Sequence, residues 1–149
     1  MSGWLTIRDA RPVDVAALAR VADASYRAAF SSIVGEAFFA ARTPADLAER
    51  FTASLDRMRV ADRDGAVVAF SMVTGTHLDM LFVDPAAQGT GAGAALLADA
   101  EARGARSLES FRDNHAARAF YERRGWRLTR AYERDVVGGV HACVFYEKG

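Results

Sequence analysis

Apolar and polar residues alternate in several short runs along the chain, which is the pattern of half-buried β-strands. In chain order these runs cover residues 5–8, 58–61, 66–73, 77–83, 107–111, 126–134 and 140–146. The turn sequence Asp62-Arg63-Asp64-Gly65 separates the second run from the third, and Gly138-Gly139 separates the last two. Turns of this kind join antiparallel neighbours. The pattern therefore predicts a sheet that is mostly antiparallel.

Other segments place apolar residues three and four positions apart, which is typical of helices that bury one face. The predicted helices run from Pro12 and Asp14 through Ala22, from the Thr43-Pro44 cap to Leu55, over 94–102, and from the Asp113-Asn114 cap through Arg124. Residues 26–42 are rich in aromatic side chains and are interrupted by Ser31-Ser32 and Gly35. We expect residues 1–149 to form one α+β domain, with a strand–helix–strand crossover near the middle of its sheet.

The composition excludes several kinds of partner. The 149 residues are 51% hydrophobic and 26% charged, as in ordinary soluble domains, and the formal net charge is zero. A neutral chain has no bulk field to attract nucleic acid or an anionic membrane, so neither is expected as a partner. Residues 1–4 do not open a signal peptide, and no apolar run is long enough to cross a bilayer. We therefore expect a cytoplasmic protein, either a monomer or a homodimer.

Cysteine and histidine usage argues against disulfide and metal chemistry. Cys143 is the only cysteine, so an internal disulfide is impossible, and its apolar surroundings favour a buried thiol over a catalytic one paired with His141. His77, His115 and His141 are scattered along the chain without the spacing of metal ligands, so no metal is expected.

A glycine-rich turn, Gln88-Gly89-Thr90-Gly91-Ala92-Gly93, lies between the strand-like run that ends near Pro85 and the helix predicted from Ala94. Backbone N–H groups in the first helical turn lack internal partners, and glycines let a phosphate approach them closely. Lys148 is the only lysine, so an anion here would depend on backbone amides and arginines. The turn therefore predicts a site for the pyrophosphate of a nucleotide-like cofactor.

Two common nucleotide motifs fit this turn poorly. A P-loop needs Lys followed by Ser or Thr after the last glycine, and Ala94-Ala95 stands there instead. Gly89, Gly91 and Ala94 satisfy the dinucleotide pattern G-x-G-x-x-A, and Glu109 lies at the offset of its ribose-binding acid. In that fold, however, the strand runs almost directly into the first glycine and usually opens the domain. A glycine-rich turn without any ligand is the remaining alternative.

A third interpretation comes from two motifs in order. Residues 81–97 contain Leu81-Phe82-Val83-Asp84-Pro85-x-x-Gln88-Gly89-x-Gly91-x-Gly93, which resembles the acyl-CoA-binding motif of the GCN5-related N-acetyltransferase superfamily. The second block, Asn114-x-x-Ala117-x-x-Phe120-Tyr121-Glu122-x-x-Gly125-Trp126, is similar to another segment of that family. The resemblance implies a mixed, mostly antiparallel central sheet flanked by helices, with splayed central strands. It also implies transfer of an acetyl group from acetyl-CoA to a primary amine by direct attack in a ternary complex.

The resemblance assigns roles to individual residues. The backbone of Leu81, Phe82 and Val83 would pair with the pantetheine arm, and the Val83 N–H would stabilise the oxyanion. Gln88 and Asn114 would contact the cofactor, and Tyr121 would protonate the departing sulfur. The amides that would hold the pyrophosphate are those of Gly89, Thr90, Gly91, Ala92, Gly93 and Ala94. The candidates for the ribose phosphate are Arg112, Arg118, Arg123 and Arg124.

The general base and the acceptor site are less narrowly defined. Glu109 and Asp79 are equal candidates for the base, and His77 is a third, since an alkylamine with a pKa of about 10 must lose a proton to react. The acceptor would be a small-molecule or peptide amine. Candidates for its binding site are Tyr26, Phe30 and His77, with Phe38, Phe39 and Arg42 as further possibilities. A CoA-binding module of the same fold without catalysis, acting as a sensor or an assembly partner, is the alternative function.

Overall fold

A computed structural model describes residues 4–137 and 139–149, so Gly138 of the predicted turn and residues 1–3 lie outside the described part. One seven-stranded sheet has the order β1-β2-β3-β4-β5-β7-β6. Only β4 and β5 pair in parallel, so the predicted mixed, mostly antiparallel sheet is confirmed. The strands are β1 (Leu5–Asp9), β2 (Met58–Arg63), β3 (Ala66–Thr74), β4 (His77–Val83), β5 (Ser107–Phe111), β6 (Arg127–Val136) and β7 (Gly139–Glu147).

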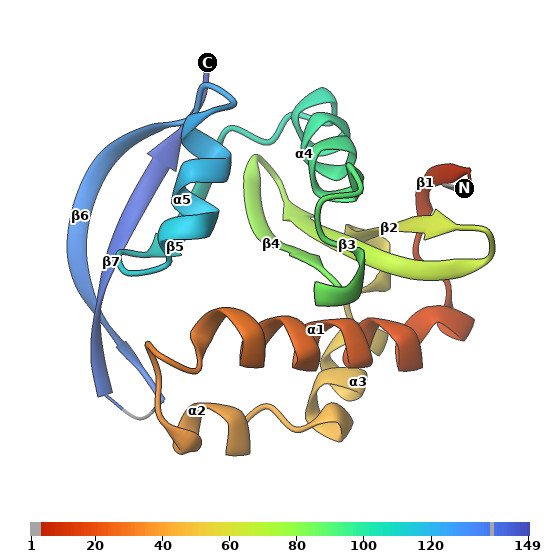
Figure 1. Cartoon of the computed structure of the whole chain (residues 1–149), viewed down its shortest axis with the longest axis horizontal. Coiled ribbons are helices and arrows are strands. Elements are labelled where there is room, and N and C mark those ends of the chain that lie inside the picture. The colour runs from red at the N-terminus through yellow and green to blue at the C-terminus, as the bar shows by residue number, and fades with distance from the viewer. Residues whose placement is uncertain (1–3, 138) are drawn as a thin grey trace.

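Helices cover both faces of this sheet. They are α1 (Val15–Phe30), α2 (Glu36–Ala40), α3 (Pro44–Thr52), α4 (Ala92–Ala102) and α5 (His115–Glu122). In Figure 1, α1, α2 and α3 gather on one side, while α4 and α5 lie on the other. No helix in the described residues is long and apolar enough to cross a membrane.

The first helix is longer than the sequence pattern predicted. It continues past Ala22 to Phe30 because Ser25, Tyr26 and Phe30 extend the buried face at spacings of three and four. A separate short helix, α2, follows Gly35 in the aromatic-rich segment. The continuation of α1 carries Tyr26 and Phe30 under the central strands, where they contact Phe82.

Apolar clusters lie on both faces of the sheet. On one face, α1 and α3 bury Leu18, Val21 and Phe51 with residues of β2, β3 and β4. On the other, a core that includes Leu97 of α4 and Trp126 at the end of α5 packs on the central and C-terminal strands. Burying both faces fixes the central strands between the two helical layers, and these strands carry the site.

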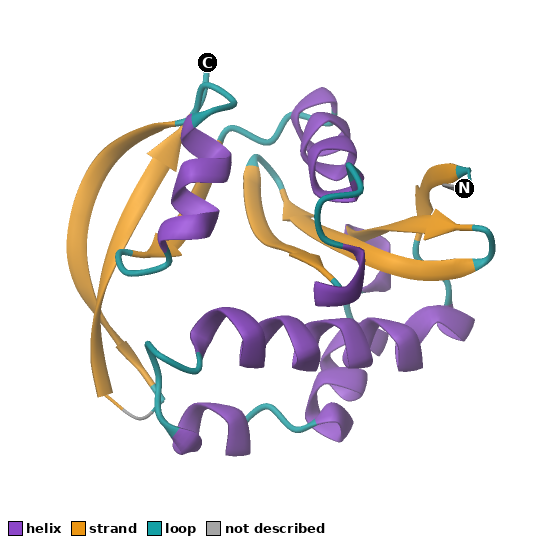
Figure 2. Ribbon diagram, viewed as in Figure 1, coloured by secondary structure: helices purple, strands orange, loops and turns teal. Residues whose placement is uncertain are grey.

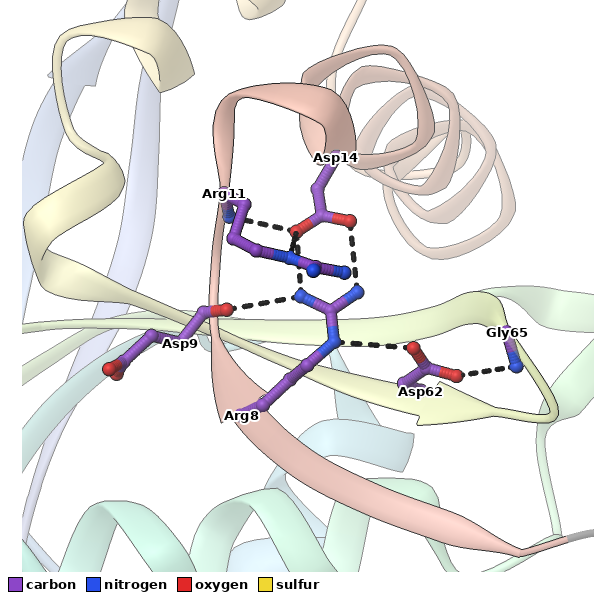
Figure 3. Close-up of polar contacts among 6 residues, drawn as sticks. All are labelled: Arg8, Asp9, Arg11, Asp14, Asp62 and Gly65. Carbon is purple, nitrogen blue, oxygen red and sulfur yellow. Dashed lines mark hydrogen bonds and ion pairs between the residues drawn. The ribbon is translucent and has the colours of Figure 1, made fainter.

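An arginine-centred network ties the start of α1 to the first strands (Figure 3). Arg8 on β1 donates to both carboxylate oxygens of Asp14, at 2.8 and 3.0 Å, and to Asp62 at 3.2 Å. Asp14 also accepts the Arg11 N–H, and Asp62 accepts the Gly65 N–H in the β2–β3 turn. The Arg8 hydrogen bonds are the main reason that the pKa of the buried Asp14 carboxyl lies below its usual value. This network connects β1, β2 and the segment before α1 at the end of the molecule away from the β6–β7 hairpin.

The two central strands separate soon after they meet. Pairing between β4 and β5 is confined to His77 with Ser107 and Leu78 with Leu108. A bulge follows at once, because Met80 opposes Met72 while Leu78 opposes Val73, which leaves Asp79 as the extra residue. Beyond it the β1–β4 and β5–β7–β6 portions of the sheet diverge (Figure 2). The predicted splaying of the central strands is confirmed.

Candidate active site

A cleft of about 660 Å³ opens where β4 and β5 diverge. Its walls come from α1, the second half of β4, the start of α4, β5, α5 and the β6–β7 hairpin. The cleft therefore brings together elements from both ends of the chain, and most of the residues that the sequence nominated line it.

The glycine-rich turn forms one end of the cleft. It follows a short helical turn at Pro85–Ala87, and α4 begins after the N-cap residue Gly91. Gly89 and Gly91 have φ angles of +79° and +90°, a left-handed conformation that glycine adopts most easily. A Cβ atom added to either would meet nothing within 4 Å, so this face of the turn is open. Gly93 differs, since its Cβ would lie 3.2 Å from a Val83 methyl; it allows α4 to pack closely on β4.

The backbone amides of this turn are available for an anion. Within the described part of the chain, no amide of residues 89–94 donates a hydrogen bond, while the Gly91 carbonyl already accepts from Ala95. These amides lie at the positive end of the α4 dipole. Apart from Thr90, every residue from Ala87 to Ala94 lines the cleft. The open amides of this turn therefore suit a diphosphate group.

The second half of β4 forms the floor of the cleft. Leu81, Phe82 and Val83 pair with β3 on one side, whereas β5 has already diverged on the other. Ser25 on α1 donates to the Val83 carbonyl at 3.0 Å and so holds the end of the strand against the helix. Sequence reasoning missed Ser25, because nothing in its surroundings distinguishes it from other polar residues of a helix. The open edge of β4 suits an extended ligand that pairs as a strand would.

Tyr121 and Asn114 lie on α5 and both line the cleft. Asn114 is the N-cap residue of the helix and accepts the Ala117 N–H at 3.4 Å. Tyr121 is buried against Phe120 and Trp126, and burial raises the pKa of its hydroxyl above the usual value. Its hydroxyl has no hydrogen-bond partner among the described residues. At neutral pH this phenol therefore holds a proton next to the cleft.

The three candidate bases occupy different environments. Glu109 lines the cleft and accepts hydrogen bonds from the Tyr132 hydroxyl and the Arg134 guanidinium. Asp79 also lines the cleft, is exposed, and accepts a hydrogen bond from Thr74. His77 does not line the cleft; its ring lies 2.8 Å from the Ser107 hydroxyl, where β4 and β5 still pair. The structure therefore brings the two carboxylates to the cleft and leaves the histidine outside it.

The opposite end of the cleft is aromatic and basic. Tyr26, Phe30 and Phe38 line it, whereas Phe39 is buried elsewhere in the core. Arg42, Arg50 and Arg134 line the same end, and sequence reasoning had considered only the first. Arg50 comes from α3, which directly follows the aromatic segment, whereas Arg134 comes from β6, whose distance in sequence gave no sign of its proximity.

The remaining arginine candidates divide into two pairs. Arg123 and Arg124 at the end of α5 line the cleft, and Arg124 stacks on Phe120 with its carbon Cζ 4.0 Å from the ring centre. Arg112 instead pairs with Asp113, and Arg118 donates to the Tyr146 hydroxyl at 2.9 Å. Only the first pair is therefore placed for a ligand phosphate.

Cys143 lines the cleft, but its surroundings do not favour a catalytic thiol. The Cys143 thiol is buried and donates to the His141 carbonyl, and burial raises its pKa, so it is a poor nucleophile at neutral pH. Among the residues that the structure describes, no cluster of three or more His, Cys, Asp or Glu could hold a metal ion.

Comparisons with known proteins give a consistent picture. Residues 19–142 match the family model of the acetyltransferase (GNAT) domain. The chain is 28% identical to a GCN5-related N-acetyltransferase from Rhodopseudomonas palustris, with a TM-score of 0.77 over 100% of this chain and 98% of that one. No curated protein matches the chain significantly.

Two further solved structures share the fold at lower identity. Apo-form YjaB from Escherichia coli has a TM-score of 0.78 at 23% identity, over 97% of both chains. The PaiA N-acetyltransferase from Thermoplasma acidophilum, solved in complex with coenzyme A, has a TM-score of 0.70 at 16% identity, over 97% of this chain and 99% of that one.

Proposed function

Because the chain belongs to the GNAT acetyltransferase family, we propose that it transfers an acetyl group from acetyl-CoA to a primary amine by direct attack in a ternary complex. The observation that carries this proposal is the open glycine turn, whose six consecutive amides, 89–94, donate to nothing in the described chain. The PaiA structure with coenzyme A, which has the same fold, supports it.

Each part of coenzyme A has a counterpart in the cleft. The amides of Gly89 to Ala94 would bind the diphosphate, and the open edge of β4 from Leu81 to Val83 would pair with the pantetheine arm. Gln88 and Asn114 line the cleft on either side of this path, and Arg123 and Arg124 are available for the ribose phosphate. The cosubstrate supplies the activated acetyl group as a thioester.

The Val83 N–H is the proposed oxyanion donor. It lies where the floor of the cleft meets the start of α4, and the hydrogen bond from Ser25 to the carbonyl of Val83 fixes this peptide segment. A preorganised donor of this kind lowers the barrier of acyl transfer by about 3 kcal/mol.

Two side chains of the protein would move the protons. Transfer forms a C–N bond to the amine and breaks the C–S bond of the thioester, so the amine must lose a proton and the thiolate must gain one. Tyr121 keeps its proton at neutral pH because it is buried, and it can pass that proton to the thiolate. Its position on the cleft wall, next to Phe120, supports this role.

Asp79 is the carboxylate better suited to accept the amine proton, through a water molecule. Both oxygens of Glu109 are already engaged, one by the Arg134 guanidinium and the other by the Tyr132 hydroxyl, so this carboxylate has less room to accept a proton from the amine. Asp79 has only Thr74 as a donor in the described structure and projects from the bulge of β4 where the cleft begins. Glu109 would then orient the acceptor amine.

A thiol-release assay tests the proposed function. Acetyl-CoA is supplied with a panel of amino acids, peptides, polyamines and aminoglycosides, and free thiol is measured along with coenzyme A binding by calorimetry. Turnover with at least one amine and inhibition by coenzyme A are expected. Tight coenzyme A binding without turnover on any amine would contradict the enzyme and favour a CoA-binding module of the same fold.

A further inference from the structure

The charges that line the cleft are unbalanced. Five arginines line it against two carboxylates, although the whole chain has no net charge. Arg123 and Arg124 directly follow α5 and line the cleft beside the path proposed for coenzyme A. Arg134 is neutralised by Glu109. Arg42 and Arg50 remain, at the acceptor end of the cleft.

Arg42 is held in place with its charge directed at the cleft. Its guanidinium stacks on Phe38, with Cζ 3.9 Å from the ring centre, and one nitrogen donates to the Phe38 carbonyl at 3.3 Å. Within the described residues, neither Arg42 nor Arg50 forms an ion pair with a carboxylate. Burial and repulsion from Arg50 and Arg134 lower the pKa of Arg42, so its charged form is destabilised in this site. A bound anion would stabilise that charged form.

The wall beside these arginines is formed by aromatic rings that pack on one another. Tyr26 contacts Phe30, Phe38 and Phe82 at ring-centre distances of 5.0–5.8 Å, and Phe30 contacts Phe111 at 5.0 Å. All five rings line the cleft. A bound molecule would therefore meet an aromatic surface on one side and uncompensated guanidinium groups on the other.

We infer that the acceptor is a small amine that also carries a carboxylate and an apolar group, such as an aromatic amino acid, with Arg42 and Arg50 binding the carboxylate. This inference rests on the proposed function and specifies its substrate class. A guanidinium recognises a carboxylate through paired N–H donors, and the aromatic wall would bury the apolar group. Polyamines and aminoglycosides carry several positive charges and would be repelled by the same arginines.

A matched series of acceptors tests the inference. L-Phenylalanine, L-phenylalanine amide and 2-phenylethylamine share the ring and the primary amine, and only the first has a carboxylate; 3-amino-4-phenylbutanoate moves the carboxylate one methylene farther away. The variants are Arg42→Gln, Arg50→Gln and the double variant. Arg127→Gln is the control, because Arg127 is an exposed residue of β6 that does not line the cleft.

The expected result is a preference for the acids of about ten- to a hundredfold in kcat/KM, the value of one or two charge-assisted hydrogen bonds. In the Arg42 and Arg50 variants this preference should disappear through a higher KM for the acid. The rates with 2-phenylethylamine should fall much less than those with the acids, and Arg127→Gln should leave the ratio between the two substrates unchanged.

A binding measurement separates this inference from the proposed function. N-acetyl-L-phenylalanine and N-acetyl-2-phenylethylamine are titrated into wild type and variants by calorimetry, which requires no turnover. Tighter binding of the acid that is lost in the Arg42 and Arg50 variants supports the arginine site, even if no amine is acetylated and the proposed function fails. Equal turnover, or equal affinity, for the molecules with and without the carboxylate would overturn the inference and leave the acetyltransferase assignment intact.

Discussion

Replacing Tyr121 with phenylalanine removes one hydroxyl from the cleft and leaves the buried ring in place. The ring packs against Phe120, Trp126 and Tyr146, and the hydroxyl has no hydrogen-bond partner among the described residues. Losing an unpaired hydroxyl should change the free energy of unfolding by less than about 1 kcal/mol. The fold of the variant should therefore be intact, and any effect on the rate can be assigned to chemistry.

If Tyr121 protonates the departing thiolate, Tyr121→Phe should have a much lower kcat than the wild type. General acid catalysis contributes about 10²- to 10⁴-fold, so kcat should fall by that factor, which corresponds to a barrier higher by about 3 to 5 kcal/mol. The KM for acetyl-CoA should change little, because the turn and the β4 edge remain. Since burial raises the pKa of Tyr121 above the usual 10, the wild-type rate should show no loss of activity from its deprotonation below pH 9.

The assay is steady-state thiol release, combined with thermal unfolding, and Tyr146→Phe is the matched control. Tyr146 is also buried, but its hydroxyl accepts from Arg118 and donates to Glu122, and it does not line the cleft. That variant should lose stability and keep its kcat, the reverse of Tyr121→Phe. An unchanged kcat in Tyr121→Phe would refute the assignment of the acid.

Two further predictions concern the base and the stability of the fold. Asp79→Asn should lower kcat/KM at least tenfold, whereas Glu109→Gln should mainly raise the KM of the acceptor; an unchanged kcat/KM in Asp79→Asn contradicts the assignment. Asp14→Asn breaks a buried ion pair and should cost about 3 kcal/mol at pH 7 in denaturant unfolding. Because the pKa of Asp14 is lowered in the folded state, its stabilisation is present above pH 4 and is lost as the pH falls through that lowered value, so wild type and variant should converge in acid. A difference that does not shrink below pH 4 would contradict this origin of the stabilisation.

Much of the architecture could be predicted because local chemistry determines it. Asp64 and Gly65 both have positive φ angles at the predicted β2–β3 turn, and Gly91 at the start of α4 has one as well. The length of α1 was underestimated, since Tyr26 and Phe30 belong to a pattern that becomes helical only once they are buried against β4.

Other parts of the site depend on contacts that span the chain. The sequence nominated Glu109 and Asp79 equally, and they are distinguished by the contacts of Glu109 with Tyr132 and Arg134, which are 23 and 25 residues away. His77 shares a strand face with Leu81 and Val83 under simple alternation, but the bulge at Asp79 shifts the register between them. Arg50 lines the cleft from the solvent side of α3. The apolar pattern of that helix indicates which residues are buried, so it could not show which exposed residue would face the cleft.

The most direct test of the account is calorimetric binding of coenzyme A to two variants of Gly91. Asn and Asp have the same shape, tolerate a positive φ better than other side chains, and differ in one charge. A Cβ atom at Gly91 meets nothing within 4 Å, and both variants carry the same backbone strain at φ +90°, so comparing one with the other cancels that strain.

If the amides of this turn bind the diphosphate, a carboxylate about 5 Å from it would repel it by about 3 kcal/mol at an effective dielectric near 20. The Kd of Gly91→Asp for coenzyme A should therefore exceed that of Gly91→Asn by about a hundredfold. Equal affinities for the two folded variants would contradict the placement of the cosubstrate on which the whole account is built.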